Sequence, residues 1–251
     1  MIPLRLRQIA LVGADLAACA ADIEAVLGVS HPYDDPGVGN YGLRNGVWAV
    51  GQTFLEVVSP RQEGTTAGRL LDKRGGDGGY MVILQVRDLA AARATAAKAG
   101  ARIVDQIDRD GVAATHYHPR EVGGAILSID WMDPWARWEW GGPGWEANAR
   151  PGQAIVGAEL QANDPAAMAA RWGEVLGRPV ERSGGVWRIA LDGGEIRFVP
   201  LADARGEGLR GFDVAWPDPD AARAAARQRG LIDADGEVML CGTTVFLQAA
   251  S

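Results

Sequence analysis

The chain has 251 residues, 47% of them apolar and 23% charged, which is typical of a globular protein of one large or two ordinary domains. Its net charge of −7 argues against a nucleic-acid-binding protein, which needs clustered Lys and Arg. No apolar run approaches the roughly 20 residues that a membrane-spanning helix needs. We therefore expect a cytoplasmic protein with neither nucleic-acid nor membrane partners.

A pattern of an apolar strand, a turn aspartate and an alanine-rich helix occurs four times along the chain. Equivalent positions in the four strands, each followed seven residues later by the aspartate, are Gln8 with Asp15, Met81 with Asp88, Gly157 with Asp164, and Gly211 with Asp218. An aspartate there can cap the helix that follows it, and a glycine can end that helix. The predicted helices span residues 16–27, 89–99, 165–176 and 219–229.

Further strands follow each of these helices. They are predicted at residues 46–50 and 53–58 in the first repeat, 101–107, 113–118 and 125–130 in the second, 185–191 and 195–199 in the third, and 237–240 and 243–248 in the fourth. Each repeat is therefore a strand and a helix followed by two or three strands, and repetition of this kind indicates the architecture before any single residue does.

The segment 139–153 contains four glycines and two prolines, which is typical of a linker. We predict an N-terminal domain at residues 1–142, with modules 4–60 and 79–135. A linker at 143–152 would precede a C-terminal domain at 153–251, with modules 153–202 and 209–251. A single module cannot bury its sheet alone, so two modules would pair within each domain.

Paired βαβββ units of this kind resemble the vicinal-oxygen-chelate superfamily, which includes glyoxalase I, methylmalonyl-CoA epimerase, extradiol dioxygenases and bleomycin-resistance proteins. Two segments carry the resemblance most clearly. Residues 53–60 are similar to the strand that ends in a metal-binding Glu or Gln, and residues 118–127 are similar to the His-Pro-Lys-x-x-Gly-Gly-Val-Leu stretch of the epimerases. The resemblance implies an α+β fold of two glyoxalase-like domains, each a curved mixed sheet with a concave cleft and outer helices.

In that superfamily, side chains from four strands hold a divalent metal that stabilises an oxyanion intermediate. The four ligand positions of the first domain fall on Gln8, Glu56, Met81 and Ser128. Only Gln8 and Glu56 are ordinary ligands, because a thioether and a hydroxyl bind such ions poorly. Asp130 shares a strand face with Ser128 and could complete the set. In the second domain, the matching Gly157 and Gly211 have no side chain to ligate a metal.

The resemblance also suggests other site residues. Glu56 and His118 are the candidate catalytic groups, although His118 in the epimerase-like loop is more often a structural or substrate-contacting residue than a ligand. The candidate substrate contacts are Arg44, Trp48, Arg74, Tyr80 and Ser128. Tyr80 and Arg74 flank the glycine-rich crossover between the two modules, which lacks the ending of a phosphate-binding loop.

Two functions compete at this point. The first is a metabolite-binding protein that uses the first-domain cleft without a complete standard metal site. The second is a metal-dependent lyase, epimerase or dioxygenase with a remodelled site, for which the metal would be Zn, Mn, Fe, Co or Ni. A pure scaffold is a third class. The partner in the first two cases is a small molecule, and the sequence leaves catalysis and a homodimer open.

The chain has two cysteines, Cys19 and Cys241, which belong to different repeats. In a reducing cytosol, two free buried thiols are favoured over a disulfide. We therefore expect both thiols to be free.

Overall fold

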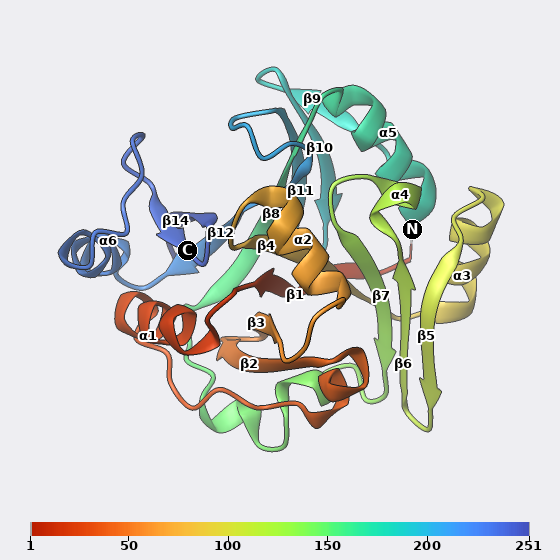
Figure 1. Ribbon diagram of the computed structural model, residues 1–251. Coiled ribbons are helices and arrows are strands. Elements are labelled where there is room, and N and C mark those ends of the chain that lie inside the picture. Colours follow the sequence, from red (N-terminus) through yellow and green to blue (C-terminus); the bar gives the residue numbers. More distant parts are fainter. Residues whose placement is uncertain (1, 251) are drawn as a thin grey trace. The chain divides into compact units, whose positions relative to one another are not determined.

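The computed structural model describes residues 2–250, so the outermost ends of the two predicted domains, residues 1 and 251, lie outside the described residues. Two mixed β-sheets of seven strands each, with helices, make an α+β fold (Figure 1). The first sheet has the strand order β2-β3-β1-β4-β7-β6-β5. Its strands are β1 (Leu4–Val12), β2 (Leu43–Val50), β3 (Thr53–Pro60), β4 (Gly78–Val86), β5 (Ile103–Arg109), β6 (Val112–Tyr117) and β7 (Ile126–Met132).

The second sheet takes all its strands from the C-terminal part of the chain and has the order β13-β14-β12-β8-β11-β10-β9. Its strands are β8 (Ala154–Ala162), β9 (Glu181–Ser183), β10 (Val186–Leu191), β11 (Gly194–Pro200), β12 (Gly208–Trp216), β13 (Val238–Leu240) and β14 (Thr243–Ala249). The predicted two-domain fold class is thereby confirmed, whereas the domain boundaries stay a prediction.

The fourfold repeat is visible in the strand register. In every module the first strand pairs in parallel with the last one, as β1 with β3, β4 with β7, β8 with β11, and β12 with β14. The four predicted equivalent positions have partners at matching places: Gln8 with Phe54, Met81 with Ile126, Gly157 with Glu195, and Gly211 with Thr244. Residues two positions further along the last strands are therefore equivalent too, and these are Glu56, Ser128, Arg197 and Phe246.

The main helix of each module begins where its aspartate predicts. Asp15, Asp88, Asp164 and Asp218 cap α1 (Leu16–Leu27), α3 (Leu89–Lys98), α5 (Pro165–Leu176) and α6 (Pro219–Gln228) by accepting backbone N–H bonds. Gly28 and Gly177 end α1 and α5 in the left-handed conformation. The helices α3 and α6 end one residue earlier than predicted. No helix among the described residues is long and apolar enough to cross a membrane.

Several elements were not predicted. They are α2 (Thr66–Arg74), α4 (Pro119–Val122), the short strand β9, and the 3-10 turns η1 (Pro36–Tyr41), η2 (Glu139–Gly141) and η3 (Trp145–Ala147). The most consequential is α2, which Thr65 caps and Gly75 ends, because it directly precedes the predicted glycine-rich crossover in a stretch where no element was predicted.

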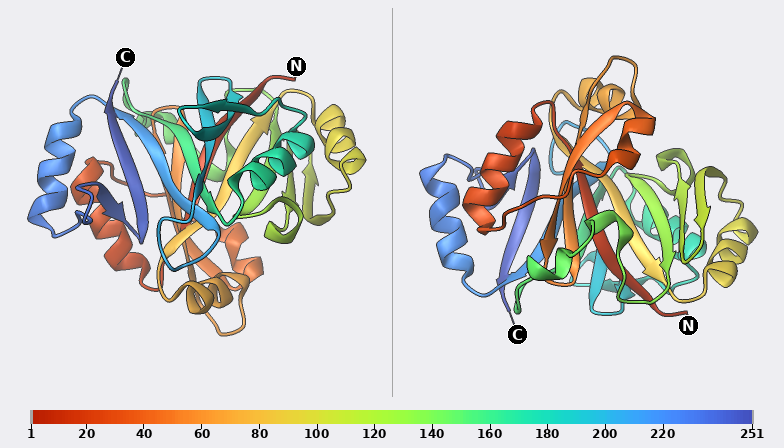
Figure 2. Two further views of the ribbon diagram at one scale, coloured as in Figure 1. Left: turned by 90° about the horizontal axis from the view of Figure 1, so that it is seen from above. Right: turned by 90° about the horizontal axis from the view of Figure 1, so that it is seen from below.

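The chain forms two compact units that draw on separate segments. One comprises Met1–Arg7, Met81–Glu139 and Gly157–Leu209, and the other Gln8–Tyr80, Trp140–Val156 and Arg210–Ser251. Within the first unit α3 lies against α5, and within the second α1 lies against α6 (Figure 2). The first helix and the last helix of the chain are therefore neighbours, which brings residues at opposite ends of the sequence together.

Candidate functional site

The candidate site is centred on Glu56, which β3 holds in the interior of the second unit. Only 6% of the Glu56 surface is exposed. Gln8 on β1 donates from Nε2 to Glu56 Oε2 at 2.8 Å, and Asn45 on β2 donates from Nδ2 to Glu56 Oε1 at 2.6 Å. The backbone N–H of Asp35 donates to Asn45 Oδ1 at 2.9 Å, which fixes the orientation of the Asn45 amide. Both carboxyl oxygens of Glu56 therefore accept hydrogen bonds from neutral amides.

The environment shifts the protonation of Glu56. Burial raises the pKa of Glu56 to about 7 against the opposing hydrogen bonds of Asn45 and Gln8, and the nearby charge of Asp35 raises it further. The two amides cannot supply a positive charge to offset the carboxylate. A carboxyl group with a pKa near 7 can both accept and release a proton at neutral pH, which is the property that a general acid or base needs.

A solvent-connected cavity of about 280 Å³ lies beside α2. Its lining residues are Asn40, Tyr41, Gly42, Leu43, Gln62, Gly64, Thr65, Thr66 and Tyr80. The lining is rich in neutral hydrogen-bonding groups and includes no charged side chain. Tyr80 lines the cavity, and burial and then the charge of Glu56 raise the pKa of its phenol to about 12. Tyr80 therefore stays a neutral hydrogen-bonding group at physiological pH.

One cation lies near the rim of this cavity. Arg69 on α2 is exposed and donates to the Gly64 carbonyl and, at 3.0 Å, to Thr66 Oγ1. Gly64 and Thr66 both line the cavity, so the Arg69 guanidinium is held close to its entrance. Arg69 was not among the predicted site residues.

Three of the predicted substrate contacts occupy other positions and do not line the cavity. Arg44 is exposed on β2. Trp48 is fully buried and donates from Nε1 to Glu24 Oε1 at 3.2 Å, which anchors α1 to β2. Arg74 is buried at the end of α2. Of the predicted contacts in the second unit, Tyr80 is the one that lines the cavity.

The remaining predicted residues belong to the first unit. Ser128 and Asp130 are both buried on β7, and Ser128 Oγ donates to Asp130 Oδ1. His118 caps α4, where its Nδ1 accepts the N–H of Arg120 at 3.0 Å. The cap supports the structural interpretation of His118. The structure thus brings Gln8 together with Glu56, and Ser128 together with Asp130, as two separate pairs.

The chain is similar to known proteins in sequence over about half its length and in fold over most of it. No protein-family model matches the chain. An ethylmalonyl-CoA/methylmalonyl-CoA epimerase from Cereibacter sphaeroides is 28% identical over 132 residues, which are 50% of this chain and 96% of the epimerase. Two solved structures have a similar fold over most of the chain. A hypothetical protein from Staphylococcus aureus has a TM-score of 0.70 at 10% identity and covers 98% of this chain and 99% of its own.

The second structure is a mutant of 4-hydroxymandelate synthase from Streptomyces coelicolor. Its TM-score is 0.67 at 15% identity, over 92% of this chain and 76% of the synthase chain. The homology to the epimerase and the fold shared with the synthase fit the vicinal-oxygen-chelate superfamily. The glyoxalase-like resemblance inferred from the repeats is thereby confirmed. At these identities the solved structures establish the fold alone.

The residues around Glu56 do not fit the divalent metal that proteins of the vicinal-oxygen-chelate superfamily often use. Both oxygens of Glu56 are engaged by amide N–H groups, and the orientation of Asn45 is fixed by Asp35. Within the described residues, no group of three His, Cys, Asp or Glu side chains that includes Glu56 has the spacing of a metal site. A Zn²⁺ or similar ion needs several such ligands. No chemical step is therefore assigned to a metal on Glu56.

Asn45 was not predicted as a site residue, although the hairpin turn at Gly51 fixes a strand register that places it near Glu56. The turn sets Val47 opposite Glu56, and alternation along β2 then puts Asn45 on the face of Val47. A second omission is the group formed by Cys19, Asp77 and Cys241, here called the cysteine–aspartate cluster, whose ligand atoms all lie within 4.8 Å of one another. Both cysteines are buried and free, as predicted.

Proposed function

We propose that this chain is a glyoxalase-like protein that binds a small oxygen-bearing metabolite in the cavity beside α2, without a divalent metal on Glu56. The observation that carries the proposal is the pair of hydrogen bonds from Gln8 and Asn45 to the two oxygens of Glu56. These neutral donors satisfy the buried carboxyl group, so it needs no cation to remain inside the protein.

The lining and volume of the cavity support one class of ligand. Its neutral hydroxyl and amide groups suit a molecule with several hydrogen-bonding oxygens, and its volume of about 280 Å³ suits a small one. Tyr80 would contact the ligand through its hydroxyl group, with Glu56 behind it. Arg69 near the rim would favour a ligand with a carboxylate at its solvent-facing end.

Binding is tested by titrating the protein, in buffer with a chelator, with pyruvate, catechol and propane-1,2-diol as probes of three oxygen chemistries. The removal of one hydrogen bond by Tyr80→Phe should weaken binding by up to about tenfold. The matched control is Tyr117→Phe, a buried tyrosine on β6 in the first unit. Equal affinities of the two variants for every probe that binds, or no binding of any probe, would contradict the role of the cavity.

The claim that no divalent metal binds at Glu56 is tested in a Cys19→Ser/Cys241→Ser variant. These substitutions remove the cysteine–aspartate cluster as a second possible metal site. The protein is purified without chelator, reconstituted separately with Zn, Mn, Fe, Co and Ni, and analysed for bound metal. We expect no stoichiometric metal. Stoichiometric metal in this background that Glu56→Ala abolishes would overturn the proposal.

A second candidate is an epimerase-type enzyme that moves a proton at a carbon next to a carbonyl group. The match to the ethylmalonyl-CoA/methylmalonyl-CoA epimerase and the near-neutral pKa of Glu56 favour it. Incubation with methylmalonyl-CoA or ethylmalonyl-CoA in deuterated water separates the two candidates. The binding function predicts no deuterium at C2 above the buffer rate. The enzyme function predicts incorporation that Glu56→Gln abolishes.

A further inference from the structure

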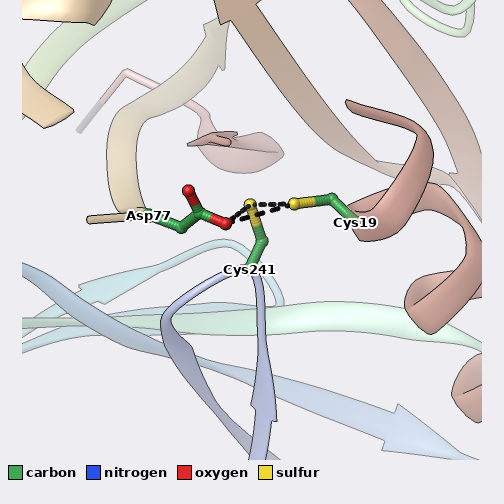
Figure 3. A group of neighbouring side chains, drawn as sticks. All are labelled: Cys19, Asp77 and Cys241. Atoms are coloured by element: carbon green, nitrogen blue, oxygen red, sulfur yellow. Dashed lines mark hydrogen bonds between the residues drawn. The ribbon is translucent and has the colours of Figure 1, made fainter. Parts of the chain in front are cut away.

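The cysteine–aspartate cluster joins three segments that are far apart in the sequence. Cys19 lies in α1, Asp77 directly precedes β4, and Cys241 lies in the turn between β13 and β14. All three belong to the second compact unit. Figure 3 shows that their side chains point toward one another. Neither the proposed metabolite cavity nor the Glu56 site uses any of these residues.

We propose that Cys19, Asp77 and Cys241 form a zinc-binding site that ties the first helix to the last hairpin of the chain. The set consists of two thiols and one carboxylate, and sulfur ligands of this kind select Zn²⁺ over the hard ions Mg²⁺ and Ca²⁺. Three protein ligands would leave the fourth tetrahedral position to a water molecule.

The distances are close to those of a tetrahedral site. Asp77 Oδ2 lies 3.5 Å from Cys19 Sγ and 3.9 Å from Cys241 Sγ, and the two sulfurs are 2.9 Å apart. Zinc bonds of about 2.3 Å to sulfur and 2.0–2.2 Å to oxygen imply roughly 3.5 Å between S and O and 3.8 Å between the two sulfurs. The sulfur–oxygen distances therefore fit already, and the sulfurs need to separate by about 0.9 Å, which side-chain rotation can supply.

The carboxylate of Asp77 is oriented by the backbone. The N–H of Ala14 donates to Asp77 Oδ1 at 2.8 Å, which leaves Oδ2 facing the sulfurs. Hydrogen bonds of this kind commonly orient the ligands of metal sites. Asp77 is partly exposed, whereas Cys19 and Cys241 are 4% and 7% exposed. The aspartate side of the cluster therefore offers the path by which an ion and a water molecule would enter.

The turn that carries Cys241 is unusual for its sequence. Leu240 pairs with Thr243, so Cys241 and Gly242 form a two-residue turn with φ angles of 46° and 65°. Asn or Asp, not Cys, is the usual partner of Gly in such turns, because few residues with a Cβ adopt positive φ. A Cβ on Gly242 would lie 2.1 Å from the Asp77 carbonyl oxygen, so Gly242 allows this turn to approach Asp77.

Metal binding would be coupled to proton release. A divalent ion stabilises coordinated thiolates beside a carboxylate. Binding would release the two thiol protons, and the site would carry two thiolates, one carboxylate and Zn²⁺.

The site is tested with the full chain purified under reducing conditions and titrated with Zn²⁺ against a chromophoric chelator, and with Co²⁺ to detect thiolate-to-cobalt charge-transfer absorption. We expect one zinc per chain. Cys19→Ser and Cys241→Ser should each abolish stoichiometric zinc binding, and Asp77→Asn should weaken it by at least about tenfold while the cobalt–thiolate absorption persists. Glu56→Gln is the matched control and should bind zinc like the unmodified chain.

Circular dichroism checks that each variant is folded. If a cysteine variant does not fold, Asp77→Asn, which retains both thiols, still tests the site. The absence of bound zinc in the unmodified chain would overturn the proposal. So would zinc binding that survives both cysteine substitutions. A mass lower by two hydrogens together with no zinc binding would instead identify the cysteines as a disulfide. Because Glu56→Gln and the cysteine variants report separately, failure here is distinguishable from failure of the proposed function.

Discussion

The first and third modules place opposite charges at the same point of the same strand pair. In the first, Glu56 on β3 lies opposite Ala10 on β1; in the third, Arg197 on β11 lies opposite Glu159 on β8. Glu56 is held by neutral amides, whereas Arg197 donates to Glu159 at 3.1 Å and to Glu195 at 3.3 Å. One position thus holds a buried carboxyl group with a pKa near 7, and the other holds a charge in an ion pair.

The other two modules extend this contrast. The equivalent positions hold Ser128 on β7 and Phe246 on β14. Of the four copies, the first is therefore the one that retains a carboxylate. The repeated backbone explains the fold in all four modules, but the chemistry depends on the side chain that each module places there.

The largest effect should come from breaking the charge pair of the third module. In Arg197→Met the buried Glu159, which is 7% exposed, loses its ion pair with Arg197. Removing one member of a buried ion pair should lower the free energy of unfolding by about 3–5 kcal/mol, measured by urea denaturation.

The double variant Arg197→Met/Glu159→Leu tests the cause. Because it removes the buried carboxylate as well as its cation, it should be more stable than Arg197→Met alone. If the double variant is instead less stable than the single one, packing of the Arg197 side chain, and not its charge, accounts for the loss.

The next effect concerns the first module and depends on pH. The folded pKa of Glu56 is about 7 and its ordinary value is 4.5, so between these values the folded protein binds more protons than the unfolded chain. The free energy of unfolding should therefore fall as the pH rises from 4.5 to 7 and change little above that window. The contribution of Glu56 should be about 3 kcal/mol.

Other groups titrate in the same range, so the measurement is the difference between the unmodified chain and Glu56→Gln in urea denaturation at several pH values. Glutamine cannot ionise, and its curve should lack this fall. Parallel curves for the two proteins would show that Glu56 keeps an ordinary pKa and would remove the support that its protonation gives to the epimerase-type alternative.

Most of the fold could be predicted from the sequence because its signals are local and repeated. The aspartate caps at Asp15, Asp88, Asp164 and Asp218 set where the main helices begin. The helix α2 was not predicted, although Thr65 and Gly75 bound it with the usual cap residues, because it lies between the modules and outside their repeated pattern. The helix matters for the site, since it borders the cavity and carries Arg69.

The site was less predictable because it depends on contacts between distant segments. Gln8 and Glu56 were candidates because the resemblance to the vicinal-oxygen-chelate superfamily places two ligand positions on them. The cysteine–aspartate cluster was not, since Cys19 and Cys241 are 222 residues apart and meet through the packing of the first helix against the last module. No periodicity within a module indicates such a meeting, and the three-dimensional structure was needed to reveal it.

The smallest effect should come from Arg188, which also pairs with Glu195 but at a more open place. The side chains of Arg188 and Glu195 are each 32% exposed, against 13% for Arg197 and 9% for Glu159. Water can replace a lost partner at the more exposed pair, so Arg188→Ala should change the free energy of unfolding by less than about 1 kcal/mol. High salt should reduce the difference further, because exposed charges are screened. A loss as large as that of Arg197→Met would mean that Arg188 and Arg197 form one buried network. The exposed fraction of each pair would then no longer explain how much that pair contributes to stability.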